Sequence, residues 1–214
     1  MKKTSVKRGT IKDAAAVVLA GGESKRFGRD KSTAPLMEQT FTERVLEVLS
    51  PLFDTIFIGV RRKPHPLEDL VALPFIADSV DIKGPLAGIY TAMKTITSPW
   101  LFVIACDMPL VRRELIVYLA ERRDNNHCVV PVVRGKAQPL CAFYNKEALL
   151  ERVEQYIRNG GRNLKDFLNS GDIKTCYIEE KELSVADPEL VTFIDIDTAQ
   201  DVAVVEKILR EGTR

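Results

Sequence analysis

The sequence predicts an α/β fold in which helices cover a mostly parallel sheet. Short runs rich in Val, Ile and Phe alternate with amphipathic stretches through residue 133. These runs lack the polar alternation of a half-exposed strand, which is typical of strands buried on both faces. Strand and helix patterns that alternate along the chain favour parallel strands joined by helical crossovers.

The individual elements follow in chain order from the same patterns. Predicted strands cover residues 14–20, 55–60, 75–78, 100–107 and 128–133. Predicted helices cover residues 42–49, 86–96, 113–123 and 146–159, where apolar residues recur at helical spacing. Later strands are expected at 137–144, 173–178 and 191–194, one of them antiparallel. Asp197 or Thr198 is expected to cap a final helix that runs to Leu209.

Composition and charge limit the classes of protein to which the chain can belong. It has 214 residues, 45% of them hydrophobic and 29% charged, as in an ordinary globular protein. The net charge of +1 lacks the basic excess of a nucleic-acid-binding protein. No apolar run is long enough to span a bilayer, so we expect no nucleic-acid or membrane partner.

Domain organisation and location follow from the ends of the chain and its cysteines. Residues 1–13 are expected to form a basic flexible tail, and residues 14–214 a single domain. The basic start has no apolar segment behind it, so it is not a secretory signal. None of the four cysteines forms a C-x-x-C pair, which favours free thiols in a reducing compartment. We therefore expect the protein to be cytoplasmic.

A glycine-rich loop follows the first predicted strand, in the stretch AVVLAGGESKRFGRDKS at residues 16–32. In open α/β sheets, ligands bind beyond the carboxyl ends of the strands. Gly21 and Gly22 lack a Cβ, so the backbone can turn tightly and its amides can cradle an anion. Arg26 and Lys31 supply the positive charge that phosphates need. The loop therefore predicts a polyphosphate site.

Two common phosphate motifs do not fit this loop. Gly22 and Gly28 are one residue too far apart for G-x-x-x-x-G-K-[ST], and Lys31 does not follow Gly28 directly. The adjacent glycines also fail the G-x-G-x-x-G spacing of a dinucleotide site. The alternative is a plain glycine-rich turn with solvated charges.

Two further predicted strands end at an aspartate. Asp107 ends the apolar run LFVIACD, and a carboxylate is costly to bury there unless it is paired or binds a metal. Beside a polyphosphate, Mg²⁺ is the expected metal, and a helix cap is the alternative role. Asp78 ends an earlier strand, ahead of a helix that opens at Gly84-Pro85. Asp78 is a candidate hydrogen-bond acceptor for a ribose or base, the alternative being a turn aspartate.

These motifs together resemble a known enzyme family. LAGG at 19–22, S-x-R-x-G-x-D-K at 24–31, DS at 78–79, GPLAG at 84–88 and CDMP at 106–109 occur in the order found in molybdenum cofactor guanylyltransferases. QPL at 138–140 and FIDIDTAQD at 193–201 resemble later segments of this MobA family. The resemblance implies a Rossmann-like, three-layer α/β/α nucleotidyltransferase fold. It also implies transfer of GMP from GTP to the phosphate of molybdopterin, with release of pyrophosphate.

The resemblance also implies roles for individual residues. The nucleotide-binding set comprises Leu19, Ala20, Gly21, Gly22, Lys31, Asp78, Gly84 and Asp107. Lys31 matches the phosphate-binding lysine and Asp107 the Mg²⁺ ligand, and the charge of Arg26 adds it to the catalytic set. Since the attacking phosphate is already anionic, catalysis is expected to consist of alignment and charge stabilisation. Lys31 and Arg26 would neutralise the leaving pyrophosphate. Transient contacts with other cofactor-biosynthesis proteins or with acceptor proteins are also expected.

One segment departs from the family pattern. The family commonly has F-x-N-x-N-T-P where this chain has Asp195 and Asp197 and no proline. Asparagine can donate hydrogen bonds, but an ionised aspartate can only accept them. Asp195 and Asp197 are therefore candidates for the second substrate, for the metal or, for Asp197, for a helix cap. Arg162, in GGRNLKDFL, is a candidate for the phosphate of the second substrate, and a surface arginine is the alternative.

Other functions on the same fold remain open from the sequence. A cytidylyltransferase for the same cofactor or a sugar-phosphate nucleotidyltransferase would use a similar loop, but Gly21 leaves more room for a purine. A non-catalytic nucleotide sensor or cofactor carrier is a rival from a different class. Lys31 and Asp107 favour an enzyme over such a binding protein.

Overall fold

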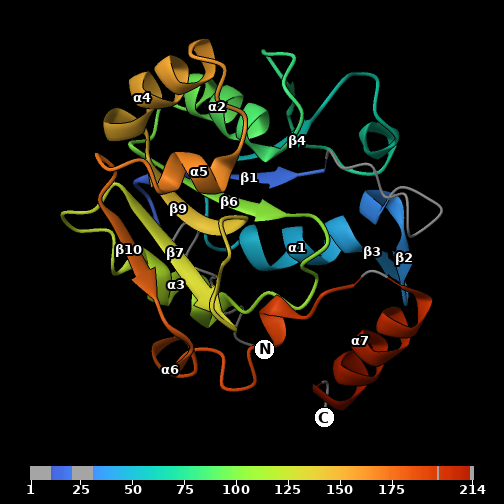
Figure 1. The fold of residues 1–214 in the computed structure, drawn as a ribbon. Helices are drawn as coiled ribbons and strands as arrows, with labels where there is room; N and C mark the ends of the chain where they lie inside the picture. The colour runs from blue at the N-terminus through green and yellow to red at the C-terminus, as the bar shows by residue number, and fades with distance from the viewer. Residues whose placement is uncertain (1–10, 21–30, 197, 213–214) are drawn as a thin grey trace.

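The computed structural model describes residues 11–20, 31–196 and 198–212, with a twisted central sheet at its middle (Figure 1). The strands of this sheet lie in the order β10-β7-β9-β6-β1-β4-β5, and β8 pairs with β7 off this path. Their bounds are β1 Ala14–Leu19, β4 Ile56–Val60, β5 Phe75–Ala77, β6 Trp100–Ala105, β7 Cys128–Val133, β8 Lys136–Ala137, β9 Cys141–Asn145 and β10 Thr175–Ile178.

The direction of the strands confirms the predicted fold class. β1 runs parallel to both β4 and β6, β4 parallel to β5, and β7 parallel to β10. β9 lies between β6 and β7 and runs antiparallel to both. The sheet is therefore mostly parallel, with the late antiparallel strand that the sequence predicts.

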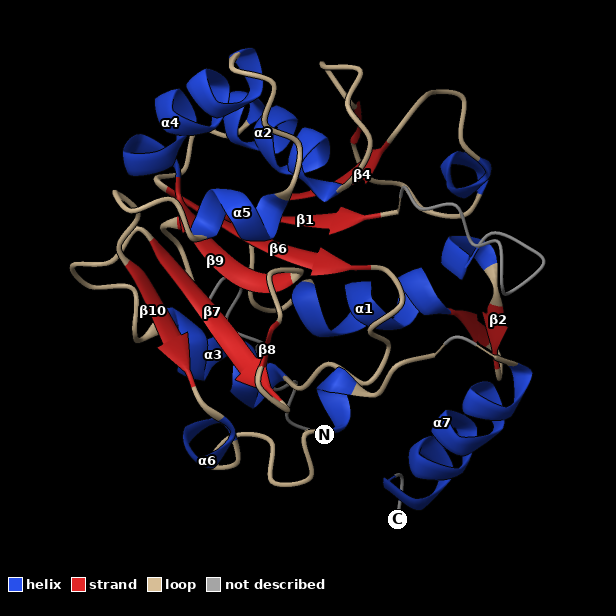
Figure 2. Ribbon diagram, in the orientation of Figure 1, coloured by secondary structure: helices blue, strands red, loops and turns tan. Residues whose placement is uncertain are grey.

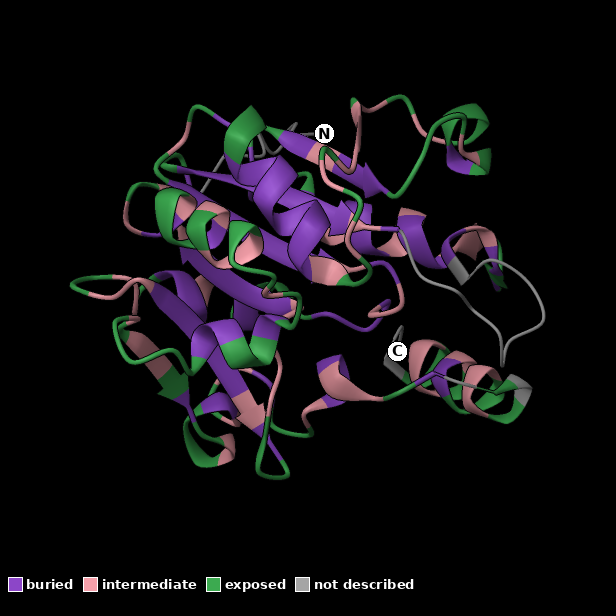
Figure 3. Cartoon of the chain, turned by 45° about the horizontal axis from the view of Figure 1, so that its top comes forward, coloured by how far each residue is buried: buried purple, intermediate pink, exposed green. Residues whose placement is uncertain are grey.

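Helices cover both faces of this sheet, which gives three layers (Figure 2). The helices are α1 Phe41–Leu49, α2 Pro85–Thr95, α3 Arg113–Ala120, α4 Lys146–Arg158, α5 Leu164–Leu168, α6 Glu180–Leu183 and α7 Ala199–Gly212. Short 3₁₀ helices cover η1 Lys31–Thr33, η2 Pro66–Asp69 and η3 Val191–Phe193. Successive strand residues point to opposite faces: Phe102 packs with α1 and α3, and Val103 packs with α2, α4 and α5. Burial on both faces explains why the strand patterns show no polar alternation (Figure 3).

A third apolar cluster lies to one side of the main sheet. It joins the hairpin of β2 (Pro35–Leu36) and β3 (Gln39–Thr40) to α1 and α7 through Leu36, Phe41 and Val205. Thr198 caps α7 as expected, because its hydroxyl accepts the Asp201 N–H and Asp201 accepts the Thr198 N–H. Asp197, the other predicted cap, lies outside the described residues.

The structure corrects two predicted strands. Val191–Phe193 form the 3₁₀ helix η3 rather than a strand, because the buried carboxylate of Asp187 accepts the Val191 and Thr192 N–H groups, and Ile194 follows η3 as its C-cap. The predicted strand 137–144 is divided into β8 and β9. The separating turn contains Pro139, which has no N–H to donate to a sheet.

The start of the described chain is packed rather than frayed. Ile11, within the predicted tail of residues 1–13, is buried and donates its N–H to Leu52 O at 3.1 Å. Asp13 pairs with Arg123 at 3.0 Å. The four cysteines are free thiols. In the described part of the chain, no helix is both long and apolar enough to cross a membrane.

Candidate active site

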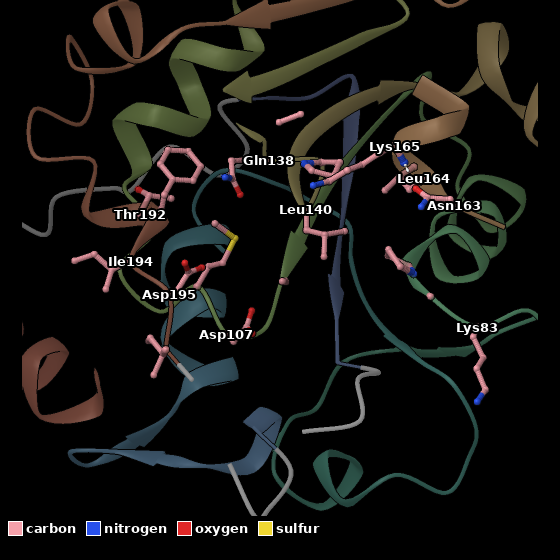
Figure 4. A pocket seen from close by; sticks show the side chains of 18 of the residues that line it. Lys83, Asp107, Gln138, Leu140, Asn163, Leu164, Lys165, Thr192, Ile194 and Asp195 are labelled. Atoms are coloured by element: carbon pink, nitrogen blue, oxygen red, sulfur yellow. Dashed lines mark hydrogen bonds between the residues drawn. The ribbon is translucent and has the colours of Figure 1, made fainter. Parts of the chain in front are cut away.

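A cavity of about 770 Å³ opens at the carboxyl ends of the parallel strands (Figure 4). Five segments form its walls: the end of β6 with residues 105–108, the start of α2 at 83–85, the turn at 137–140, residues 162–165 around the start of α5, and residues 192–196 after η3. Four of the sequence-predicted site residues therefore share one cavity, namely Gly84, Asp107, Arg162 and Asp195.

Asp107 lies beside the end of β1. Leu19 and Ala105, the last residues of β1 and β6, are paired in register, and Cys106 N–H donates to Leu19 O at 3.1 Å. The end of β1 and the turn that carries Asp107 therefore lie side by side. Asp107 is half-buried and lines the cavity. A carboxylate at this position faces whatever ligand occupies the strand ends.

Gly84 shapes the wall formed by the start of α2. Its φ of 108° and ψ of 175° lie in a region that only glycine adopts readily. Pro85 occupies the first turn of the helix, where the missing N–H costs nothing. The cavity therefore has exposed backbone at Gly84, with Lys83 beside it.

Leu19 and Asp78 lie next to one another, outside the cavity wall. Gly88 in α2 approaches both: a Cβ at Gly88 would lie 2.8 Å from Leu19 Cδ2 and 3.5 Å from Asp78 Oδ1. Burial raises the pKa of Asp78 to about 6, although the positive charge of Arg61 acts in the opposite direction. Asp78 is therefore a carboxyl group with a raised pKa, close to Leu19 at the end of β1.

The wall at α5 is cationic and rich in amides. Arg162 and Lys165 are exposed at the cavity, and Gln138 faces it from the turn before β9. The Oδ1 of Asn163 accepts the N–H groups of Lys165 and Asp166 at 2.8 and 3.3 Å, which caps α5 and fixes this wall.

Sequence reasoning missed part of this wall. Lys83, Gln138, Asn163 and Lys165 line the cavity but were not among the predicted site residues. Gln138 and Lys165 belong to motifs that the family resemblance singles out, QPL and GGRNLKDFL. The sequence alone does not show that these four residues share a site, because only the order of the strands in the sheet brings their segments to the same cavity.

Several predicted site residues, most of them in the glycine-rich loop, lie outside the part of the chain that the structure describes. Gly21, Gly22, Arg26 and Asp197 lie outside the described residues. Lys31 begins η1, and the Thr42 hydroxyl donates to the neighbouring Ser32 O at 2.8 Å, which anchors η1 to α1. The roles of these five residues stay predictions.

The carboxylates of the cavity are a chemically reasonable set for Mg²⁺. Among the described residues, no group of three or more His, Cys, Asp or Glu side chains is placed to hold a metal ion. Asp107 and Asp195 nevertheless line the same cavity, from the turn after β6 and from the segment after η3 (Figure 4). Mg²⁺ typically takes one or two protein carboxylates and completes its octahedron with phosphate oxygens and water. Asp107 and Asp195 therefore fit this metal in the presence of a nucleotide.

Comparison with known proteins agrees with this geometry. The family model of the MobA-like NTP transferase domain matches residues 16–174. A Bacillus mycoides (strain KBAB4) protein named "Probable molybdenum cofactor guanylyltransferase" is 32% identical over 91% of this chain and 96% of its own length. A protein of the same name from Bacillus cereus (strain Q1) is 33% identical over the same shares. Molybdopterin-guanine dinucleotide biosynthesis protein A from Archaeoglobus fulgidus superposes with a TM-score of 0.79 and 27% identity, over 92% of this chain and 99% of that one.

Proposed function

The chain belongs to the MobA-like NTP transferase family, and from this premise we propose that it is a molybdenum cofactor guanylyltransferase. The proposed reaction transfers GMP from GTP to the phosphate of molybdopterin and releases pyrophosphate. The relatives named molybdenum cofactor guanylyltransferase, similar over nearly their full length, support this acceptor and this base over the alternatives.

The observation that carries the proposal is the cavity at the carboxyl edge of the sheet. It places Asp107, beside the end of β1, in one space with the cationic wall of Arg162 and Lys165. A nucleotide bound at the end of β1 and an anionic acceptor at α5 would therefore meet beside Asp107. Such convergence is what transfer between two phosphates requires.

The residues on the donor side would bind the nucleotide and its phosphates. Asp107 and Asp195 would hold Mg²⁺, which supplies positive charge to the triphosphate when it is bound. Lys31 and Arg26 would offset the charge that develops on pyrophosphate. Gly21, which has no Cβ, would leave room for guanine, and Asp78 would accept hydrogen bonds from the nucleoside.

The residues on the acceptor side would orient the attacking phosphate. Arg162 offers a planar fork that matches phosphate geometry, and Lys165 adds a point charge on the same wall. A phosphate monoester is already anionic near neutral pH, so this chemistry needs no general base. The contribution of this wall is alignment, which places the acceptor oxygen in line with the α-phosphorus.

Nucleotide-dependent pyrophosphate release tests the proposal. The assay contains Mg²⁺ and molybdopterin and compares GTP with CTP, ATP and UTP. Wild type is compared with Asp107→Asn, and with Asp69→Asn as a control on the exposed helix η2. Release with GTP alone, lowered ~10²–10³-fold in Asp107→Asn and unchanged in the control, is expected because a charged group at the reacting phosphates is removed.

The other outcomes separate the rival functions. A preference for CTP would keep the mechanism but contradict the role assigned to Gly21. No pyrophosphate with any nucleotide, despite measurable GTP binding, would favour a carrier or sensor and contradict the enzyme assignment.

A further inference from the structure

The carboxylate of Asp187 is fully buried and connects the η3 segment, which lines the cavity, to Arg112, the residue before α3. Its Oδ1 accepts the Val191 N–H at 3.1 Å and its Oδ2 accepts the Thr192 N–H at 3.0 Å. Arg112 Nε lies 3.2 Å from Oδ1, and the side chain of Asp187 has no exposed surface. A charge buried to this degree is retained only where its partners satisfy it, so the four groups form one unit.

A second hydrogen bond joins Arg112 to this group of residues. The backbone N–H of Arg112 donates to the hydroxyl of Thr192 at 3.1 Å. Arg112 is therefore attached to the η3 segment twice, through its side chain to Asp187 and through its backbone to Thr192. We call Arg112, Asp187, Val191 and Thr192 the Asp187 network.

Two members of the Asp187 network are close in sequence to the two carboxylates that face the cavity. Arg112 follows Asp107 by five positions in the turn that leads from β6 into α3. Thr192 precedes Asp195 by three positions, and both line the cavity (Figure 4). The segments that carry Asp107 and Asp195 come from distant parts of the chain, and the network joins them close to both.

We propose that Asp187 is a positioning residue that fixes Asp195 relative to Asp107, so that the two carboxylates can share one divalent cation. This proposal rests on the metal role given to Asp107 and Asp195 in the proposed function. Asp187 itself does not line the cavity, so its effect is exerted through Arg112 and Thr192. Because hydrogen bonds to two successive amides fix backbone orientation, loss of the carboxylate frees the segment that leads to Asp195.

The chain offers a matched control on the other side of α3. Arg123 also pairs with a carboxylate, that of Asp13, and is largely buried. It lies near Trp100, at the amino end of β6, whereas the cavity lies at the carboxyl end of that strand. Arg123→Gln removes a partly buried ion pair without touching the cavity. Asp187→Asn and the milder Thr192→Val, which keeps side-chain shape but removes the hydroxyl acceptor, both change the network.

Two measurements test the proposal on the full chain. Hydrogen exchange without ligand should show at least about tenfold faster exchange of the amides at 191–196 in Asp187→Asn, a smaller increase in Thr192→Val, and no change there in Arg123→Gln. Mn²⁺ binding in the presence of GTP, followed by electron paramagnetic resonance, should weaken about tenfold in Asp187→Asn and remain as in wild type in Arg123→Gln.

The outcomes separate this proposal from the proposed function. Unchanged exchange at 191–196, wild-type Mn²⁺ affinity in Asp187→Asn, or equal losses in Arg123→Gln would each overturn the positioning role. Excess Mg²⁺ should restore the rate of Asp187→Asn but not that of Asp107→Asn, which a merely structural defect would not allow. If wild type binds Mn²⁺ but releases no pyrophosphate, and Asp187→Asn still binds Mn²⁺ more weakly, the result would count against the proposed function and support the positioning role.

Discussion

Gly88 of α2 packs directly against Leu19, the last residue of β1, so that a Cβ on Gly88 would lie 2.8 Å from Leu19 Cδ2. This contact places α2, whose N-cap is Gly84, against the strand that leads into the glycine loop. The contact is with the end of a side chain rather than with backbone, so relief requires Leu19 to move.

The first prediction concerns this contact. Gly88→Ala is expected to destabilise the fold by at most about 1 kcal/mol, because the overpacking that displaces the end of the Leu19 side chain is partly offset by the higher helix propensity of Ala. It should also weaken GTP binding several-fold, since Leu19 is displaced. Denaturant unfolding and GTP titration measure the two effects. Leu19→Val shortens the contacting side chain and should restore stability to the double variant, whereas Gly171→Ala, with open space around its Cβ, should have little effect alone.

The second prediction concerns Gly84, where the cost has a different origin. No atom lies within 4 Å of a Cβ built there, but the φ of +108° is strained for any side chain. Gly84→Ala should therefore cost about 1–3 kcal/mol of unfolding free energy from the backbone alone. Leu19→Val should not rescue this variant. Wild-type stability in Gly84→Ala would show that the start of α2 can adopt another conformation.

The third prediction concerns the pH dependence of stability. Burial raises the pKa of Asp78 from 3.8 to about 6, so the folded protein holds this proton more tightly than the unfolded chain does. The stabilisation of the fold by protonated Asp78 is therefore fully present below about pH 4 and is lost as the pH rises through about 6. Asp78→Asn should be more stable than wild type above pH 6 by about 1 kcal/mol, a modest value because the carboxyl group is only half-buried.

Unfolding curves for both proteins between pH 4 and 8 measure this difference. It should grow from pH 4 to 6 and stay constant above. A difference that is independent of pH would contradict the raised pKa of Asp78.

The fourth prediction concerns the cationic wall. The KM for the acceptor should rise roughly tenfold in Arg162→Gln and in Lys165→Gln. This factor corresponds to the smallest free energies typical of a lost hydrogen bond to a charged group, and it is expected because both side chains are exposed. The KM for GTP should change little, and added salt should reduce the difference between wild type and variants. Lys181→Gln, on the exposed helix α6, is the control. A rise in the KM for GTP instead would place the nucleotide on this wall.

Much of the fold follows from local patterns. The apolar parts of the predicted strands 14–20 and 100–107 become β1 and β6, because strands covered by helices on both faces need apolar residues throughout. The segment at 191–194 has the same apolar character but forms η3, because Asp187 supplies acceptors for its amides. No pattern within residues 191–194 contains that information.

The candidate site divides in the same way. Asp107 and Gly84 could be predicted because each stands at a strand end or helix start where ligands bind in α/β sheets. Lys83 and Lys165 lie at the starts of α2 and α5, but an exposed lysine is normal on any surface and does not by itself indicate a site. They become candidates only when the fold brings residues 83–85 and 162–165 around one cavity.

The reversed direction of β9 has a consequence for how acceptor preference can change. Because β9 runs against β6, the turn 138–140 that begins it lies at the same edge as the end of β6. Under the proposed roles, the residues that contact the nucleotide itself lie at or before Asp107 and those that contact the acceptor follow residue 137, whereas Asp195 serves only the metal. The two preferences are thus encoded in consecutive stretches of the gene. Recombination in the region between them could exchange one acceptor for another while the nucleotide half is inherited intact.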